Sequence, residues 1–202
     1  MPQHPWAELI STWFAETLDD DSAVPARMKW WFSADKGRDA ELAARFSGLV
    51  EQCAQGKMYR WLEEPEGRLG LILALDQLPR NLFRGTPRAF AYDSHGAALC
   101  LAAAHTGEDR ELKPVQRAFL YMPLQHFEDP QAQNAGVALY QQLAEENPGR
   151  PIFAEGFLSY ARQHRDIIAR FGRFPHRNKI LGRKNTAGEA EYLTRGAPTF
   201  GQ

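Results

Sequence analysis

Cysteine and long apolar runs are both scarce in this sequence. Cys53 and Cys100 are its two cysteines in 202 residues, which is too few for a disulfide framework, and we expect both to be buried, unreactive thiols. The longest apolar run, Ala97 to Ala104, is too short to cross a bilayer. The start of the chain also shows no basic segment followed by an apolar one. These absences predict a soluble cytoplasmic protein with no membrane partner.

Net charge is nearly absent as well, at −1 for the whole chain. A protein that binds along nucleic acid needs a basic face that neutralises many phosphates, so we expect no nucleic-acid partner. Positive charge is nevertheless concentrated in one stretch, His164 to Arg183, which has a formal charge of +5 and leaves the remainder at −6. This basic stretch marks the place to look for a site.

Alternating apolar and polar residues, the pattern of strands, are not found, whereas helical spacing recurs throughout. We expect helices over 5–18, 39–62, 68–77, 93–107, 114–127, 129–147, 151–171 and 186–196. Helix pairs recur at intervals of about 35 residues, a spacing typical of helical-hairpin solenoids. The sequence therefore predicts one all-α domain over 1–202, built of stacked antiparallel helical hairpins and tetratricopeptide-like.

Boundary residues support several of these helices. Asp93 is expected to cap one, Asp129 followed by Pro130 to begin another, and Thr186 with Glu189 to form a capping box. The helix from residue 68 is apolar on nearly every side, which is typical of a helix buried all round. A proline at residue 79 should kink or end it beside polar residues.

All five tryptophans lie within the first 61 residues. An aromatic ligand cage is one interpretation of this concentration. A hydrophobic cap on the first helices is the favoured one, because bulky aromatic residues mostly serve packing.

Three segments, Leu75–Asp93, Tyr121–Asp129 and Arg170–Arg183, together resemble the bacterial domain of unknown function 924 family. The resemblance spans nearly the whole chain and implies a tetratricopeptide-like all-α fold without an established activity. Gln125 and Phe127 stand where the family pattern has Glu and Ser beside His126. A catalytic glutamate at position 125 is therefore not expected here.

Polar residues in these segments and in the helix before the third stand beside apolar ones, so we expect them to converge. The candidate catalytic residues are Asp76, His126, Glu128 and His164, and the candidate ligand-binding residues are Gln77, Arg80, Asn81, Arg84, Arg165, Arg170, His176, Arg177 and Asn178. Arginines outnumber carboxylates in this set. Surplus guanidinium groups suit a phosphate or carboxylate, so a small anionic ligand is the leading hypothesis.

Three other interpretations stay open. The charged residues could form only a structural ion-pair network, in which acids such as Asp76 lock the helices in register. His126 or His164 could act as acid or base in a metal-independent hydrolase. Stacked hairpins could instead bind a peptide or protein.

Metal and cofactor sites receive little support from the sequence. The spacing of His126 and Glu128 places them on different faces of a helix, and neither His-x-x-x-His nor Cys-x-x-Cys occurs. The glycine-rich dinucleotide and phosphate-loop motifs are missing as well. We therefore expect no metal and no cofactor.

Overall fold

The computed structural model describes residues 4–201, which form helices and loops with no strand in that range. The α-helices are α1 (Pro5–Phe14), α2 (Val24–Phe32), α3 (Lys36–Ala54), α4 (Pro65–Ile72), α5 (Leu78–Leu82), α6 (Asp93–Thr106), α7 (Pro114–His126), α8 (Pro130–Glu145), α9 (Ser159–Phe171) and α10 (Ala187–Thr194). The all-α prediction is confirmed. Among the described residues, no helix combines the length and apolar character needed to cross a membrane.

The predicted central helix runs from α4 into α5 without a break and is buried along almost its whole length. The helix does not end at Pro79, which was one of the two outcomes expected there, because a π-helical segment, η4 (Leu73–Gln77), joins the two parts. Here the Leu78 N–H donates to the Leu73 carbonyl five residues back, which widens the helix by one residue just before the proline. The widened turn carries Asp76 and Gln77.

Aromatic residues from the first helices pack around this helix and α7. Trp13 and Phe14 are fully buried and meet the ring of Phe119 edge-on, and Trp31 lies 4.6 Å from it between ring centroids. Most of the tryptophan-rich start therefore belongs to the hydrophobic core. Trp31 is also close to the site described below.

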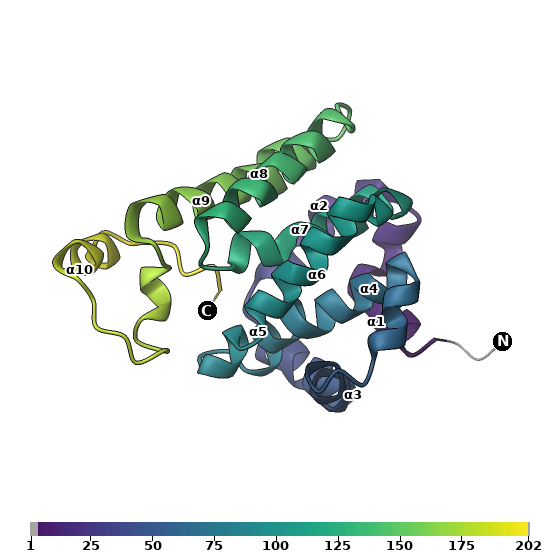
Figure 1. Cartoon of the computed structure of the whole chain (residues 1–202), viewed down its shortest axis with the longest axis horizontal. Helices are drawn as coiled ribbons and strands as arrows, with labels where there is room; N and C mark the ends of the chain where they lie inside the picture. The colour runs from purple at the N-terminus through teal and green to yellow at the C-terminus, as the bar shows by residue number, and fades with distance from the viewer. Residues whose placement is uncertain (1–3, 202) are drawn as a thin grey trace.

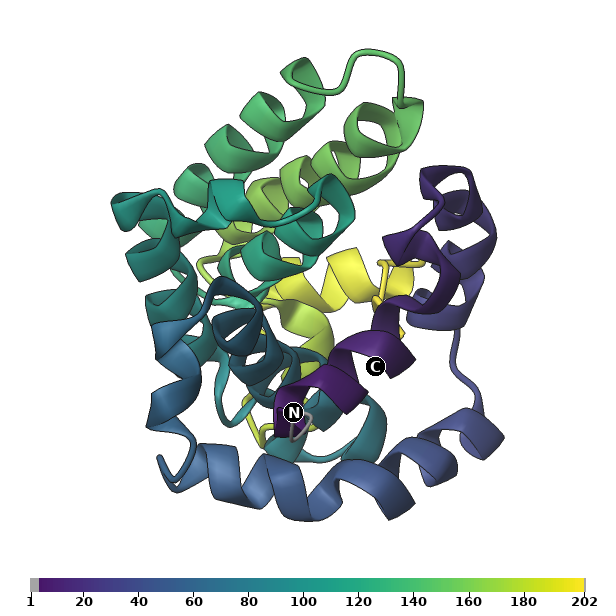
Figure 2. The ribbon, with the colours of Figure 1, turned by 90° about the vertical axis from the view of Figure 1, so that its right-hand side faces the viewer.

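Helices α6 to α9 pack in chain order, each against the next, as antiparallel neighbours (Figure 1). Close approach depends on small residues: a Cβ on Gly96 of α6 would lie 3.1 Å from the Pro123 ring of α7, and one on Gly136 of α8 would lie 3.0 Å from Leu124. Figure 2 shows α3 on the opposite side of the molecule from the α8–α9 hairpin. These stacked pairs agree with the predicted hairpins, and the tetratricopeptide arrangement stays a prediction.

The last turns of α9 and the chain after it share a smaller apolar cluster of Ile167, Ile168 and Phe174. α9 begins after a second π-helical segment, η7 (Ile152–Leu158), and ends where Gly172 adopts a positive φ of 70°. The short helix η8 (Pro175–Arg177) follows and lies against the body, whereas α10 lies at one end of the molecule (Figure 1). From α10 the chain turns back toward the centre.

The predicted helix boundaries are only partly confirmed. Asp129 accepts a hydrogen bond from the Ala132 N–H, and Thr186 and Glu189 form the capping box. Asp93 is not a cap, since it is the first residue of α6 and its carboxylate faces arginines. In the structure Asp93 therefore serves as an ion-pair partner and not as a helix cap.

Candidate functional site

A pocket forms where the central helix, α2, α7, α9 and η8 meet. We call it the polar pocket; it is lined by Trp31, Phe32, Gln77, Arg80, Asn81, Arg84, His126, His164, His176, Arg177 and Phe200, and about 60 Å³ of it is open to water. The basic stretch thus lies against the polar end of the central helix. Many of the predicted site residues come together here.

Asp76 and His126 form a directly bonded pair at the edge of the polar pocket. The Asp76 carboxylate is fully buried and lies 2.8 Å from His126 Nδ1, while Arg80 lies 3.1 Å away on the same carboxylate. Asp76 lies behind the pocket wall, and His126 lies in it. The imidazole is therefore anchored through Nδ1, with Nε2 on the side of the ring away from the carboxylate.

The protonation states of this pair follow from burial and from Arg80. Burial alone would raise the pKa of Asp76, but Arg80 and the hydrogen-bonded His126 outweigh it and keep that pKa below the ordinary value. Burial lowers the pKa of His126, and Arg80 lowers it further against the opposing effect of Asp76. A neutral imidazole that donates from Nδ1 to an ionised carboxylate has a lone pair on Nε2, which is the form of a general base.

Two further imidazoles share the pocket. The His164 ring lies 5.9 Å from that of His126, and its Nδ1 lies 2.7 Å from the Tyr160 carbonyl, so it is also anchored on one side. Burial lowers the pKa of His164 well below its usual value, and burial together with Arg177 lowers that of His176 to about 3. All three rings are therefore neutral at pH 7.

Asp93 joins two arginines of the pocket. Its carboxylate accepts hydrogen bonds from Arg80 at 2.8 Å and from Arg177 at 2.9 Å, and all three residues are buried. Burial lowers the pKa of Arg177 to about 10, with Asp93 opposing that shift and Arg80 adding to it. The Nε atom of Arg177 is buried without a hydrogen-bond partner.

The polar pocket is cationic on its inner face. Arg80, Arg84 and Arg177 line it, whereas their partner carboxylates, on Asp76, Asp39 and Asp93, lie outside the lining. Arg84 is held by Asp39 at 3.0 Å, and Asn81 donates to the same carboxylate at 2.9 Å. Positive groups thus face inward, with negative charge behind them.

Several predicted site residues lie elsewhere. Glu128 accepts from Arg183 at 2.6 Å and from the Phe174 N–H at 2.7 Å, so it anchors the loop after α9 and is not available as a catalytic partner. Asn178 bonds to Asn185 and Arg183 in the same loop. The hydrogen bonds of both side chains are made within or to this loop, so neither side chain faces the polar pocket.

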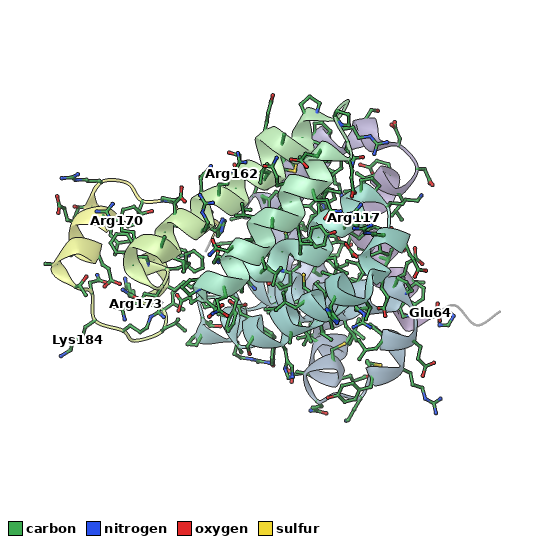
Figure 3. The ribbon with its side chains drawn as sticks, turned by 45° about the horizontal axis from the view of Figure 1, so that its top comes forward. Glu64, Arg117, Arg162, Arg170, Arg173 and Lys184 are labelled. Carbon is green, nitrogen blue, oxygen red and sulfur yellow. The ribbon has the colours of Figure 1, made fainter. Side chains whose placement is uncertain are left out.

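Two predicted ligand-binding arginines also point away from the pocket. Arg165 pairs with its neighbour Asp166 at the surface. Arg170 lies over the ring of Phe171, at the end of the molecule that carries α10 (Figure 3). Helical spacing explains this, because the face of α9 that points inward at His164 turns these two residues outward.

Sequence reasoning missed Asp39, Trp31, Phe32 and Phe200 as neighbours of the site, and treated Asp93 only as a cap. Asp93 is the last residue of the first of the three segments that carry the family resemblance, and this position could have indicated that it belongs to the site. Asp39, Phe32 and Phe200 lie in other parts of the chain, where nothing local connects them to the pocket. Residues 4–201 contain no group of three or more His, Cys, Asp or Glu placed to hold a metal ion.

Known proteins that resemble this chain include a solved structure that matches nearly all of it and enzymes that match only part of it. A solved structure of a protein of unknown function from Agrobacterium tumefaciens is 35% identical, matches with a TM-score of 0.78, and covers 95% of this chain and 97% of its own. An N-acetylglucosaminyltransferase of Sinorhizobium fredii is 32% identical over 97 residues, and one of Neorhizobium galegae is 35% identical over 81 residues.

The transferase matches are partial. They cover 48% and 40% of this chain but only 19% and 17% of those proteins. The model of a family described as bacterial protein of unknown function, DUF924, matches residues 9–197. The chain belongs to the DUF924 family.

Proposed function

We propose that the polar pocket binds a small molecule that carries one phosphate or carboxylate group. The observation that carries this proposal is the lining, in which Arg80, Arg84 and Arg177 face inward and no carboxylate does. Guanidinium groups recognise such anions through paired N–H donors. The Nε–H of Arg177 is buried without a hydrogen-bond partner, so it is a donor that an anion could accept from.

The arginines also have enough partners to fold without a ligand. The sequence suggested a surplus of arginine, but Arg165 and Arg170 lie outside the pocket, and Asp39 and Asp93 pair with those that line it. The ion-pair network and an anion site are therefore compatible. A compact anion fits about 60 Å³ of open volume better than a peptide does, which disfavours the peptide-binding alternative.

A metal-independent hydrolase is the second candidate function, and the Asp76–His126 pair favours it. In this scheme His126 Nε2 takes a proton from a water, whose oxygen then bonds to the acyl or phosphoryl centre of the substrate. The bond to the leaving group breaks, and the imidazolium returns the proton to that group. Asp76 would fix the ring orientation and stabilise the imidazolium.

The name of the rhizobial transferases contributes nothing to this proposal. The segment they share with this chain is less than a fifth of their length. No feature of the polar pocket points to a nucleotide sugar.

The binding proposal is tested by isothermal titration with inorganic phosphate and acetate. Arg177→Gln keeps an amide donor for Asp93 but removes the guanidinium, so we expect anion binding to fall at least about tenfold while the helical circular dichroism is kept. Arg165→Gln removes an arginine that lies outside the pocket and serves as the matched control. Equal binding by wild type and Arg177→Gln, or no binding by wild type, would refute the proposal.

The catalytic candidate is tested with a broad panel of ester, amide and phosphate substrates. His126→Gln should lower any turnover by about 10²-fold or more, and Asp76→Asn should do the same by disturbing the imidazole. His105→Gln changes an exposed histidine far from the pocket in the chain and should leave turnover unchanged. Full activity in His126→Gln would eliminate the acid–base function.

A further inference from the structure

The chain after α10 returns to the polar pocket and enters it. Phe200 stacks on His164 with ring centroids 3.8 Å apart, and its edge meets His176 at 5.6 Å. Arg84 donates a hydrogen bond to the Gly201 carbonyl. Figure 1 shows this tail coming back from α10 toward the centre of the molecule. An aromatic ring and a carbonyl oxygen thus already rest on groups of the pocket.

A second cavity adjoins the first across Phe200. It has a volume of about 170 Å³, and its own walls are mainly apolar, with Met28, Met122, Phe157 and Tyr160. We call it the apolar cavity. The two cavities share Phe32, His126, His164 and Phe200 as lining residues. Three of these four residues are fixed on helices, so Phe200 is the partition that a moving tail could remove.

The apolar cavity has features of a ligand site. Gln125 lines it, and its Oε1 is buried without a hydrogen-bond partner. An acceptor in that state is rare in a completed core, which is consistent with a cavity that is open to a further molecule. Phe32 and Tyr160, which also line the cavity, are 43% and 48% exposed, and large exposed apolar side chains of this kind mark binding surfaces.

The tail occupies this position at a conformational cost. Phe200 has a φ of +51°, in the left-handed region that bulky residues rarely adopt. The stack on His164 and the bond from Arg84 compensate for it. A ligand that makes the same contacts can therefore replace the tail with little loss.

We infer that the ligand is an amphipathic acid, with a phosphate or carboxylate head on the arginines and an apolar body of about the size of a phenyl ring. This inference rests on the proposed function and adds the substrate class to it. The body takes the place of the Phe200 ring beside His164 and extends into the apolar cavity. The junction of head and body then lies beside His126.

Isothermal titration with phenyl phosphate and inorganic phosphate tests the inference. Burial of a phenyl ring predicts that wild-type protein binds phenyl phosphate at least about tenfold more tightly than phosphate. Phe200→Ala removes the competing ring, so it should tighten phenyl phosphate binding further and leave phosphate binding within about twofold. Tyr160→Ala should weaken phenyl phosphate alone, and Tyr59→Ala, at an exposed tyrosine that lines neither cavity, should change neither.

The outcomes separate the two proposals. Equal affinities for phenyl phosphate and phosphate would overturn the inference and leave anion binding intact. Weaker phenyl phosphate binding in Phe200→Ala would also overturn it, because the ring would then be part of the wall instead of an occupant. Binding of neither compound would refute the proposed function, and the inference with it.

Discussion

Replacement of Asp93 by Asn is the sharpest test of how the site is held together. The change keeps the shape of the side chain but removes the charge that Arg80 and Arg177 share at 2.8 and 2.9 Å. Loss of one partner of a buried ion pair costs about 3–5 kcal/mol, since the remaining charge stays buried. Arg80 keeps Asp76 as a second partner, so we expect the lower end, about 3 kcal/mol.

That loss is measurable in two independent ways. For a domain of about 200 residues, 3 kcal/mol corresponds to a drop of about 6–12 °C in melting temperature. Urea unfolding followed by circular dichroism gives the free energy directly. Glu191→Gln is the control, because its pair with Arg195 is exposed and its loss should change stability by less than about 0.5 kcal/mol.

Two additional measurements test whether the loss of stability in Asp93→Asn comes from the unbalanced positive charge. Arg177→Gln combined with Asp93→Asn removes one of the two cations that Asp93 neutralises, so the double variant should regain part of the lost stability. Phosphate should raise the melting temperature of Asp93→Asn more than that of wild type, since an anion can stand in for the missing carboxylate. A cost below about 1 kcal/mol for Asp93→Asn would refute a buried, shared carboxylate.

Three other results are expected. In the folded state the pKa of His176 is lowered to about 3 and that of His164 well below 6.5, whereas both rings take up protons in the unfolded chain. The free energy of unfolding should therefore fall as the pH drops from 6.5 to 5, by up to about 1.4 kcal/mol per pH unit for His176. His176→Gln should reduce that slope in urea titrations, and an unchanged slope would contradict the assignment. Gly67→Ala places a Cβ 2.3 Å from the Trp61 carbonyl, so it should lower the free energy of unfolding by about 1–3 kcal/mol. Gly48 lies in mid-helix with open space around it, so Gly48→Ala should raise that free energy by up to about 1 kcal/mol. Similar melting temperatures for the two variants would be inconsistent with this packing. Burial raises the pKa of Cys53 to about 12, so the native protein should react with thiol reagents only on unfolding, and fast native labelling would disprove that burial.

Local sequence patterns were enough to predict most of the helices. Apolar spacing gave α1 and α3, and the capping residues Asp129 and Thr186 gave the starts of α8 and α10, because a cap and its helix lie within a few residues of each other. Local patterns left open whether the helix ends or only kinks at Pro79. A proline removes one N–H donor, but whether the helix ends or widens depends on the packing around it, and here burial on all sides keeps the helix continuous.

The polar part of the site was predictable only where the residues share a short segment. Gln77, Arg80, Asn81 and Arg84 lie within two turns of one helix end, and the family resemblance joined them to His126 and Arg177. The same resemblance brought in Glu128 and Asn178, which serve the loop instead. A list of polar residues does not distinguish a residue satisfied by its own neighbours from one that faces a cavity.

By itself, the sequence determined that the chain is helical, that one helix is buried all round, and that basic charge gathers near its end. Helical periodicity, caps and composition act over a few residues, so a sequence expresses them directly. The tertiary structure alone decided that Asp93 joins arginines 13 and 84 residues away and that Phe200 lies between two cavities. Such contacts depend on how whole helices cross and on where the chain returns, and no local pattern encodes either.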